Sequence, residues 1–244
     1  MAGLLACGMK GFDLNRRYFI AGLAAALAVG SSTGVVNAQN TGATGVKPAA
    51  KRAISAAGGG LTILVVGDSL SAEYGLRRGS GWVALLDKQL AADGSSAHVV
   101  NASISGDTTS GGRSRLGALL AQHKPAVVVI ELGANDALRG LPLGMTEDNL
   151  SQMTQSAQKT GARVLLVGMQ MPPNYGADYG NRFAGLFDKV ARANKTALVP
   201  FLLKGVADSV DASKLFQSDG LHPKEQAHPT MLANVLPELR KLLK

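Results

Sequence analysis

Two short segments near opposite ends of the chain carry side chains suited to nucleophilic catalysis. Ser69 lies in the GDSLS stretch at 67–71, directly after an apolar run. In the DGLHP stretch at 219–223, Asp219 precedes His222 by three residues. A serine hydroxyl needs a base to accept its proton, and a carboxylate can fix the tautomer of that base and stabilise its imidazolium form. The spacing therefore predicts a catalytic triad of Ser69, Asp219 and His222.

Serine-dependent hydrolysis also needs hydrogen-bond donors for the negative charge that develops on the substrate oxygen. Two segments that follow later strands can supply them, SISGD at 103–107 and GAND at 133–136. We predict an oxyanion hole formed by the backbone N–H groups of Ser69 and Gly106 and by the side-chain amide of Asn135.

Simpler roles stay open for several of these residues. Ser69 could only cap the helix that follows it, and Asp68 and Asp136 could each serve a turn or brace a loop. His228 is a second histidine near the C-terminus and an alternative base.

The elements that position these residues can be read from the apolar pattern. Continuous apolar runs predict five strands covered on both faces, at 61–66, 98–100, 127–132, 164–167 and 197–203. Helical spacing of apolar residues predicts helices around 82–90, 116–120, 150–157, 179–194 and 229–243. Thr146 is expected to cap the third of these helices, Gly161 to end it, and Trp82 to lie in the core.

This alternation of strands and helices predicts an α/β fold. Right-handed βαβ units place a parallel five-stranded sheet, in flavodoxin-like order, between two layers of helices, which gives a three-layer α/β/α sandwich. Ligands of such folds bind at the carboxyl ends of the strands. Ser69 and the two segments with oxyanion donors all follow strand ends, so we expect them to meet there.

Together, the segments at 67–71, 133–136 and 219–223 and the glycine at 106 resemble the four sequence blocks of the SGNH (GDSL) hydrolase family. The similarity spans about residues 61–243. The resemblance implies the three-layer fold, hydrolysis of acyl esters and thioesters through an acyl-enzyme, and no metal or organic cofactor. It also favours His222 over His228 as the base, because only His222 has an acid at the family's spacing.

The acyl-binding groove is harder to predict. Ala137 stands where the family often has glycine, and it begins a loop at 136–142 that shapes acyl-chain binding in the family. Six side chains near the strand ends are predicted to bind substrate: Leu70, Tyr74, Leu138, Leu141, Pro173 and Tyr175. Two alternative functions stay open, a short-chain carbohydrate deacetylase with a short polar pocket and an exported binding module without turnover.

Composition limits the partners. The net charge is +8, but no basic run interleaved with aromatic residues indicates nucleic-acid binding. Cys7 is the single cysteine, so an internal disulfide and a cysteine zinc site are excluded. We expect a monomer that acts on small acyl esters or thioesters, with lysophospholipid among the candidates.

The first 38 residues have the pattern of an export signal. Arg16 and Arg17 precede an apolar run at 21–29, and small residues end at Ala38. The paired arginines resemble a twin-arginine signal. Residues 39–60 lack apolar periodicity and are expected to form a flexible leader before a hydrolase domain at 61–244. The mature protein is thus expected in the periplasm or outside the cell, without a stable membrane span.

Overall fold

The fold is centred on one parallel sheet of five strands. The computed structural model describes residues 60–244. The strands pair in the order β2-β1-β3-β4-β5, which confirms the predicted flavodoxin-like sheet. Their bounds are Thr62–Gly67 for β1, His98–Asn101 for β2, Val127–Glu131 for β3, Arg163–Val167 for β4 and Ala197–Val199 for β5.

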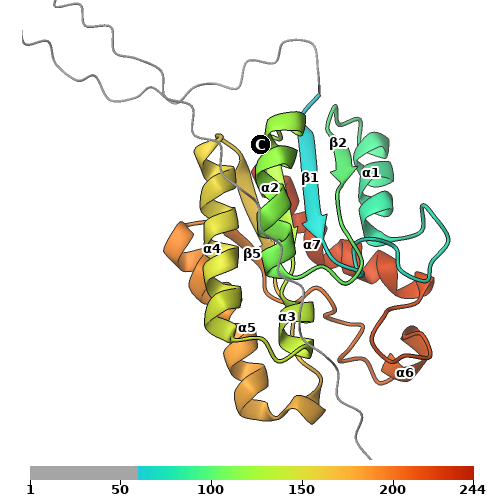
Figure 1. Ribbon diagram of the computed structural model, residues 1–244. Coiled ribbons are helices and arrows are strands. Elements are labelled where there is room, and N and C mark those ends of the chain that lie inside the picture. Colours follow the sequence, from blue (N-terminus) through green and yellow to red (C-terminus); the bar gives the residue numbers. More distant parts are fainter. Residues whose placement is uncertain (1–59) are drawn as a thin grey trace, which may run out of the picture. The chain divides into compact units, whose positions relative to one another are not determined.

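Helices cover both faces of this sheet. In Figure 1, α2 (Thr109–His123) and α4 (Leu143–Lys159) lie in front of it, with α5 (Ala177–Asn194) packed beside α4. On the other face, α1 (Trp82–Ala92) packs against α7 (His228–Leu243). The predicted three-layer α/β/α architecture is therefore confirmed.

Four short helical segments were not predicted. They are α3 (Ala134–Leu138), η1 (Pro173–Tyr175), α6 (Ala212–Leu215) and η2 (Glu225–Ala227). All four lie in segments that follow the carboxyl ends of β3, β4 or β5. They are too short to show a helical repeat of apolar residues, which is why apolar periodicity does not detect them.

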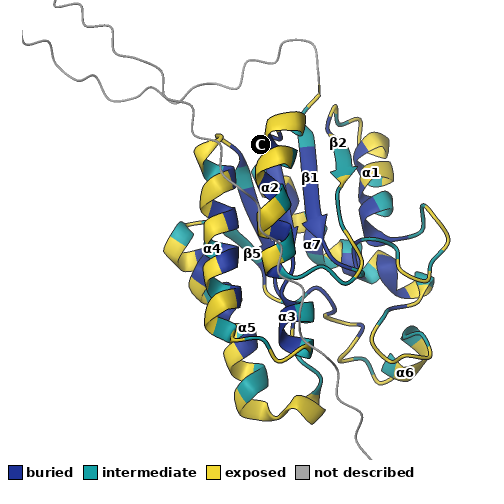
Figure 2. Cartoon of the chain, in the orientation of Figure 1, coloured by how far each residue is buried: buried dark blue, intermediate teal, exposed yellow. Residues whose placement is uncertain are grey.

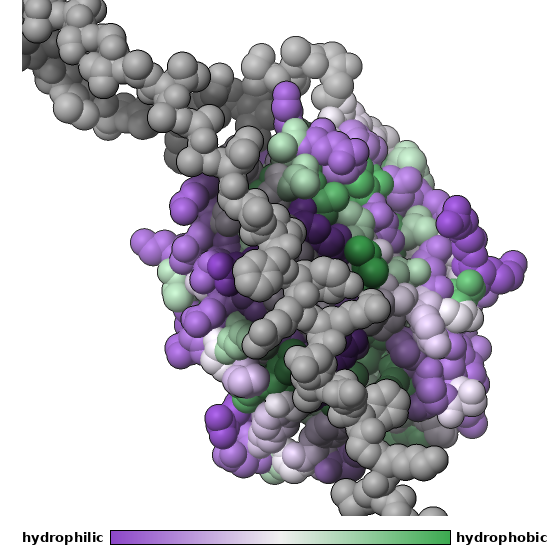
Figure 3. Space-filling model, in the orientation of Figure 1, coloured by the Kyte–Doolittle hydropathy of each residue, from purple (hydrophilic) through white to green (hydrophobic). Residues whose placement is uncertain are grey.

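The core lies on both faces of the sheet. Figure 2 shows buried residues along the strands and on the inward sides of the helices. Every residue of β3 is buried, and the predicted core residue Trp82 is fully buried at the start of α1. Phe183 and Phe187 of α5 pack edge to face, with ring centroids 5.3 Å apart. In the view of Figure 3, hydrophilic side chains predominate over the outer faces of α4 and α5.

Two predicted boundaries are wrong. The fifth strand ends at Val199, not at residue 203, because Pro200 has no N–H to continue the ladder, and the Leu202 N–H instead donates to the Gly168 carbonyl at 2.9 Å. Thr146 does not cap α4.

The helix α4 begins one turn earlier than predicted, at Leu143, after Pro142. Thr146 is consequently buried inside the helix, where its hydroxyl donates to a buried carboxylate 3.4 Å away. At the other end, Gly161 has φ +89°, a left-handed conformation that favours glycine, and the helix ends just before it, as predicted.

The predicted export signal at 1–38 and almost all of the leader at 39–60 lie outside the described residues. Within residues 60–244, no helix combines the length and apolar character that crossing a bilayer requires.

Candidate active site

Ser69, His222 and Asp219 form a continuous chain of hydrogen bonds. The His222 Nε2 atom lies 2.9 Å from Ser69 Oγ, and its Nδ1 atom lies 2.7 Å from Asp219 Oδ2. Ser69 follows β1 directly, and the other two side chains come from the segment between α6 and η2. This geometry allows the imidazole to accept the serine proton while the carboxylate holds the opposite nitrogen.

The three-residue spacing of Asp219 and His222 has a local cause. The second carboxylate oxygen of Asp219 accepts the backbone N–H groups of Leu221 and His222, at 2.9 and 3.0 Å. These bonds, with the His222 N–H as the main cause, lower the pKa of Asp219 to about 2. Asp219 is thus a carboxylate at neutral pH and is held rigidly beside the imidazole.

Two neighbours restrain His222, one at its ring and one at its backbone. The Tyr74 ring lies against it, with centroids 4.3 Å apart. The Gln217 backbone N–H donates to the His222 carbonyl at 2.8 Å, and the Gln217 side-chain amide donates to the Tyr74 carbonyl at 3.0 Å. Gln217 therefore joins the loop after β1 to the loop that carries His222.

The predicted oxyanion donors follow three neighbouring strands, β1, β2 and β3. The backbone N–H groups of Ser69 and Gly106 have no acceptor within residues 60–244. Gly106 has φ +78°, which favours glycine, and the Ile104 N–H donates to the Gly67 carbonyl at 3.0 Å. That bond fixes the Gly106 loop to the end of β1. The Asn135 amide donates one N–H to Asp68 and has a second N–H to offer.

A buried pair of acids, Asp68 and Glu131, lies beside these donors, and no feature of the sequence indicated a role for Glu131. Asp68 and Glu131 are 1% and 0% exposed. The Ser71 hydroxyl donates to Glu131 Oε2 at 2.7 Å, and Asp68 accepts the Leu70 N–H at 3.0 Å. Burial raises the pKa of Asp68 to about 6 and, together with the charge of Asp68, raises the pKa of Glu131 well above its usual range.

Comparison with known proteins shows the family of the chain. Residues 65–229 match the GDSL-like lipase/acylhydrolase family. The chain belongs to this family. It is 54% identical to the esterase TesA of Pseudomonas aeruginosa, over 75% of this chain and 89% of that protein. It is 39% identical to thioesterase 1/protease 1/lysophospholipase L1 of Escherichia coli K12, over 75% of this chain and 85% of that protein.

Solved structures of GDSL-like proteins share the fold. The crystal structure of TesA matches with a TM-score of 0.72 and 54% identity, over 74% of this chain and 99% of that chain. The psychrotrophic esterase EstA from Pseudoalteromonas sp. matches with a TM-score of 0.70 and 40% identity, over 75% of this chain and 98% of that chain. The predicted family and fold are therefore confirmed, and the chain is a hydrolase.

The alternative base of this GDSL-like hydrolase has a different environment. His228 is buried at the start of α7, where its Nδ1 accepts the backbone N–H of Trp82 at 3.0 Å. Burial lowers the pKa of His228. Its ring joins α7 to α1, whereas His222 contacts Ser69.

Asp136 braces the scaffold of the site. Its buried carboxylate accepts the Thr109 backbone N–H at 2.8 Å and also accepts the hydroxyl of the same residue. Asn149 in turn donates to the Thr109 hydroxyl at 3.0 Å. Asp136 therefore joins α3 to the N-terminus of α2 and to α4, which fits the bracing role left open by the sequence.

A cavity of about 1100 Å³ opens beside Ser69 and His222. Three of the six predicted substrate-binding residues line it: Leu70, Leu138 and Pro173. The other three, Tyr74, Leu141 and Tyr175, do not. Tyr74 instead contacts the His222 ring, and Tyr175 is exposed in η1.

Met171, a further residue expected near the groove from its place beside a strand end, also lines the cavity. Most of the remaining apolar lining was not predicted and comes from Met169, Phe201, Leu203, Phe216 and Leu221. Four of them come from the long segment between β5 and η2. Phe201 and Leu203 belong to the apolar run predicted as a strand, whereas Phe216 and Leu221 lie where no apolar periodicity indicates an element. Gly106 is not among the lining residues.

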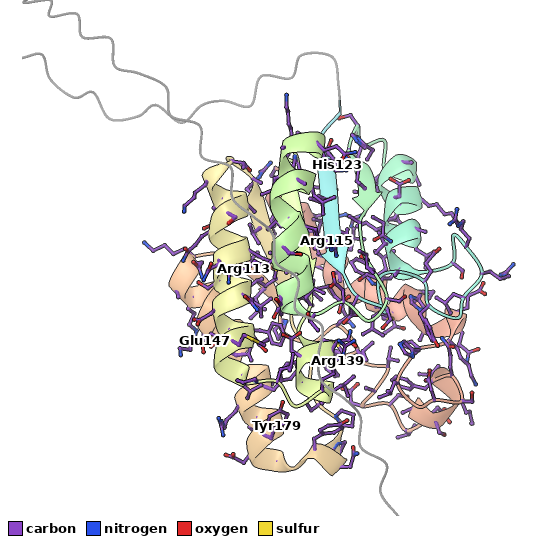
Figure 4. All side chains as sticks on the ribbon, viewed as in Figure 1. Arg113, Arg115, His123, Arg139, Glu147 and Tyr179 are labelled. Atoms are coloured by element: carbon purple, nitrogen blue, oxygen red, sulfur yellow. The ribbon has the colours of Figure 1, made fainter. Side chains whose placement is uncertain are left out.

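Arginine and tyrosine side chains fix the loops around the site. The Arg139 guanidinium donates to the Gly106 carbonyl at 2.7 Å, and the Tyr179 hydroxyl donates to the Ala137 carbonyl at 3.2 Å. Figure 4 places Arg139 beside α3 and Tyr179 on α5. The first bond joins the segment that follows Asn135 to the loop that carries Gly106.

Proposed function

We propose that this chain is an exported serine hydrolase that cleaves acyl esters and thioesters through an acyl-enzyme. The observation that carries the proposal is the hydrogen-bonded chain from Ser69 Oγ through His222 to Asp219, with distances of 2.9 and 2.7 Å. This order of groups is the one that activates a serine hydroxyl.

The first half-reaction forms the acyl-enzyme. Ser69 Oγ attacks the carbonyl carbon of the substrate while its proton passes to His222 Nε2, and Asp219 stabilises the imidazolium. The carbonyl oxygen becomes an oxyanion that accepts hydrogen bonds from the N–H groups of Ser69 and Gly106 and from the Asn135 amide. When the tetrahedral intermediate collapses, the bond to the leaving alcohol or thiol breaks and His222 returns the proton to the leaving group.

The second half-reaction frees the enzyme. A water molecule attacks the acyl carbon, and His222 accepts one of its protons. Collapse of the second tetrahedral intermediate breaks the bond to Ser69 Oγ, which regains a proton from His222. The acid product leaves, and no further group is consumed.

The shape and lining of the cavity support acyl chains as the part of the substrate that is recognised. Most of the lining surface is apolar, with four leucines, two methionines and two phenylalanines among the lining residues, and the volume of about 1100 Å³ exceeds what an acetyl group needs. The relatives include proteins named arylesterase and thioesterase 1/protease 1/lysophospholipase L1. We therefore propose ester and thioester substrates with apolar acyl chains, lysophospholipids among them.

The cavity disfavours the two alternative functions. A carbohydrate deacetylase would need a short polar acyl pocket, which does not fit this lining. A silent binding module would have no use for the hydrogen-bonded chain between Ser69 and Asp219.

The test is hydrolysis of p-nitrophenyl esters from acetyl to palmitoyl by the purified enzyme, beside Ser69→Ala. Activity that rises with chain length and is lost in the variant supports the proposal. A preference confined to acetyl supports the deacetylase, and unchanged activity in Ser69→Ala removes this serine from the mechanism. Covalent labelling by a fluorophosphonate provides a second readout, since the EstA relative is described as inhibited by monoethylphosphonate.

Export and oligomeric state are proposals with separate tests. We propose cleavage after Ala38 and a monomeric mature protein in the periplasm or outside the cell. N-terminal sequencing of the extracytoplasmic protein should begin at Gln39. Replacing Arg16 and Arg17 with lysine should block a twin-arginine route, while efficient export of that variant would indicate another route. Light scattering measures the mass of the mature protein.

A further inference from the structure

Asp68 connects the nucleophile segment to an oxyanion donor. Its carboxylate accepts the Leu70 N–H at 3.0 Å through one oxygen and the Asn135 side-chain amide at 3.1 Å through the other. Asp68 is 1% exposed, so water does not compete for these bonds. The residue beside the proposed nucleophile therefore holds the side chain of a proposed oxyanion donor.

The ionisation state of Asp68 determines which way that amide faces. A carboxylate only accepts hydrogen bonds, so it binds the Nδ2 end of Asn135 and repels the Oδ1 end. With one N–H bonded to Asp68, the second N–H of Asn135 is available to a substrate oxygen. A protonated Asp68 would instead donate to Oδ1 and would favour the turned amide.

Glu131 supplies a means of keeping Asp68 ionised. In the parallel register Glu131 lies beside Gly67, immediately before Asp68, and the Asp68 backbone N–H donates to Glu131 Oε2 at 3.4 Å. Two buried carboxylates this close cannot both be charged, so the pair retains a proton.

The contacts of Glu131 indicate that this residue carries the proton. Its Oε2 accepts the Ser71 hydroxyl at 2.7 Å, whereas its Oε1 is buried without a partner within residues 60–244. An ionised carboxylate oxygen without a partner would carry a large desolvation cost, which a protonated carboxyl avoids. His222 is the other titratable group that acts on Asp68, and its positive form favours an ionised Asp68. The Arg139 guanidinium is directed to the Gly106 carbonyl.

We propose that Asp68 is a positioning residue of the oxyanion hole, which orients Asn135 with one N–H free for the substrate, and that Glu131 keeps Asp68 ionised by holding the shared proton. This inference rests on the proposed serine hydrolase function. It assigns the two buried acids to transition-state stabilisation through Asn135.

A double-mutant cycle tests whether Asp68 acts through Asn135. The variants are Asp68→Asn, Asn135→Ala and the combination, with kcat and KM measured on p-nitrophenyl butyrate. Because loss of one oxyanion donor lowers kcat by about 100- to 1000-fold, we expect misorientation of that donor in Asp68→Asn to lower kcat by about 10- to 100-fold with little change in KM. In the Asn135→Ala background the same substitution should lower kcat by less than about twofold, since the two residues act as one unit. Equal losses in both backgrounds, or a loss confined to KM, would overturn the inference.

A second pair of variants tests whether Glu131 carries the proton. This pair also tests the inference if Asp68→Asn does not fold. Glu131→Leu removes the hydrogen bond to Asp68 and should lower kcat by at least about tenfold, on the same scale as a lost oxyanion donor. Glu131→Gln keeps a neutral donor toward Asp68 and an acceptor for the Ser71 hydroxyl, so it should recover most of that loss. If both variants lose activity equally, the neutral form of Glu131 has no role.

Ser69→Ala and fluorophosphonate labelling distinguish failure of the proposed hydrolase function from failure of the proposed role of Asp68. An enzyme that remains active as Ser69→Ala refutes the proposed function itself. If the wild-type enzyme reacts with the probe but the losses of kcat in Asp68→Asn and Asn135→Ala simply add in the double variant, only the role of Asp68 is refuted.

Discussion

The Arg115 guanidinium closes the loop that carries Gly106 by binding both of its ends. Its Nε and Nη2 atoms lie 2.9 and 2.8 Å from Asp107 Oδ2, and its Nη1 donates to the Ala102 carbonyl. The Arg115 and Asp107 side chains are only 20% and 12% exposed, so solvent screens the pair weakly. Arg115 in α2 therefore sets the path of a loop that contributes a proposed oxyanion donor, and it is not among the residues that line the cavity.

This arrangement predicts a loss of turnover in Arg115→Lys. Lysine keeps the charge, but a single ammonium cannot hold the carboxylate and the carbonyl together as the planar guanidinium does. We expect kcat to fall by about 3- to 10-fold, a fraction of the effect of losing one oxyanion donor, with a smaller change in KM. Steady-state kinetics on p-nitrophenyl butyrate measures both constants.

The matched control is Arg113→Lys, two residues earlier in the same helix. The Arg113 guanidinium donates to Asn149 Oδ1 at 3.0 Å and does not contact the Gly106 loop. Figure 4 shows both arginines on α2. If the two variants lose kcat equally, the loop contact is not the cause.

A stability measurement follows from the buried proton on Glu131. In the unfolded chain this carboxyl ionises near its ordinary pKa of 4.5, whereas in the folded protein its pKa is raised well above that value. Folding above pH 5 therefore requires proton uptake, and the wild type loses stability from this group by up to about 1.4 kcal/mol per pH unit as the pH rises. Glu131→Gln needs no proton, so its stability relative to the wild type should increase from pH 5 to pH 8.

Urea unfolding at several pH values measures this difference. Glu238→Gln, at a partly exposed glutamate of α7, controls for the removal of one carboxyl group. A difference between Glu131→Gln and the wild type that stays constant from pH 5 to pH 8 would mean that Glu131 folds as a carboxylate.

The contrast between Val128 and Glu131 illustrates what the sequence can predict. The apolar run that contains Val128 lies between two helical layers, and such two-sided burial produces the continuous apolar pattern from which the sheet was predicted. Glu131 ends the same strand and is equally buried, but no periodic pattern distinguishes a buried acid from an exposed one. Its role depends on its register beside Gly67, and register is a property of the folded sheet.

The site residues likewise differ in whether the sequence could predict them. Ser69, Asp219 and His222 were predicted because their chemistry depends on local spacing and on family resemblance, and the structure brings their side chains into hydrogen-bond contact. Phe201 was expected inside a strand but lines the cavity from just beyond β5, and Phe216 lines it from a stretch where no periodicity indicates an element. Tertiary packing alone determines that part of the lining.

The lining of the cavity predicts a change in chain-length preference for Ala212→Trp. Ala212 lies in α6 and lines the cavity, so an indole side chain at this position would occupy space available to an acyl chain. We expect kcat/KM for the decanoyl ester to fall by about tenfold or more, since each excluded CH₂ forfeits about 0.8 kcal/mol of burial, while the acetyl ester changes little. The p-nitrophenyl ester series measures the ratio.

Val210→Trp adds the same side chain two residues earlier, at a position that is fully exposed and outside the lining. It should leave the chain-length profile as in the wild type. A parallel loss for acetyl and decanoyl esters in Ala212→Trp would place the acyl chain elsewhere.

The low pKa of Asp219 predicts how activity depends on pH. With its pKa at about 2, mainly because of the His222 backbone N–H, Asp219 remains a carboxylate throughout the range from pH 4 to 8. Any decline of activity between pH 7 and pH 4 must then come from other groups, and Asp68, with its pKa raised to about 6, is one of them. Asp219→Asn should lower kcat by up to about 10⁴-fold at neutral pH, because it removes the charge that stabilises the imidazolium. The residual activity of Asp219→Asn should still decline on acidification, and a residual activity independent of pH from 4 to 7 would assign the acid limb to Asp219 after all.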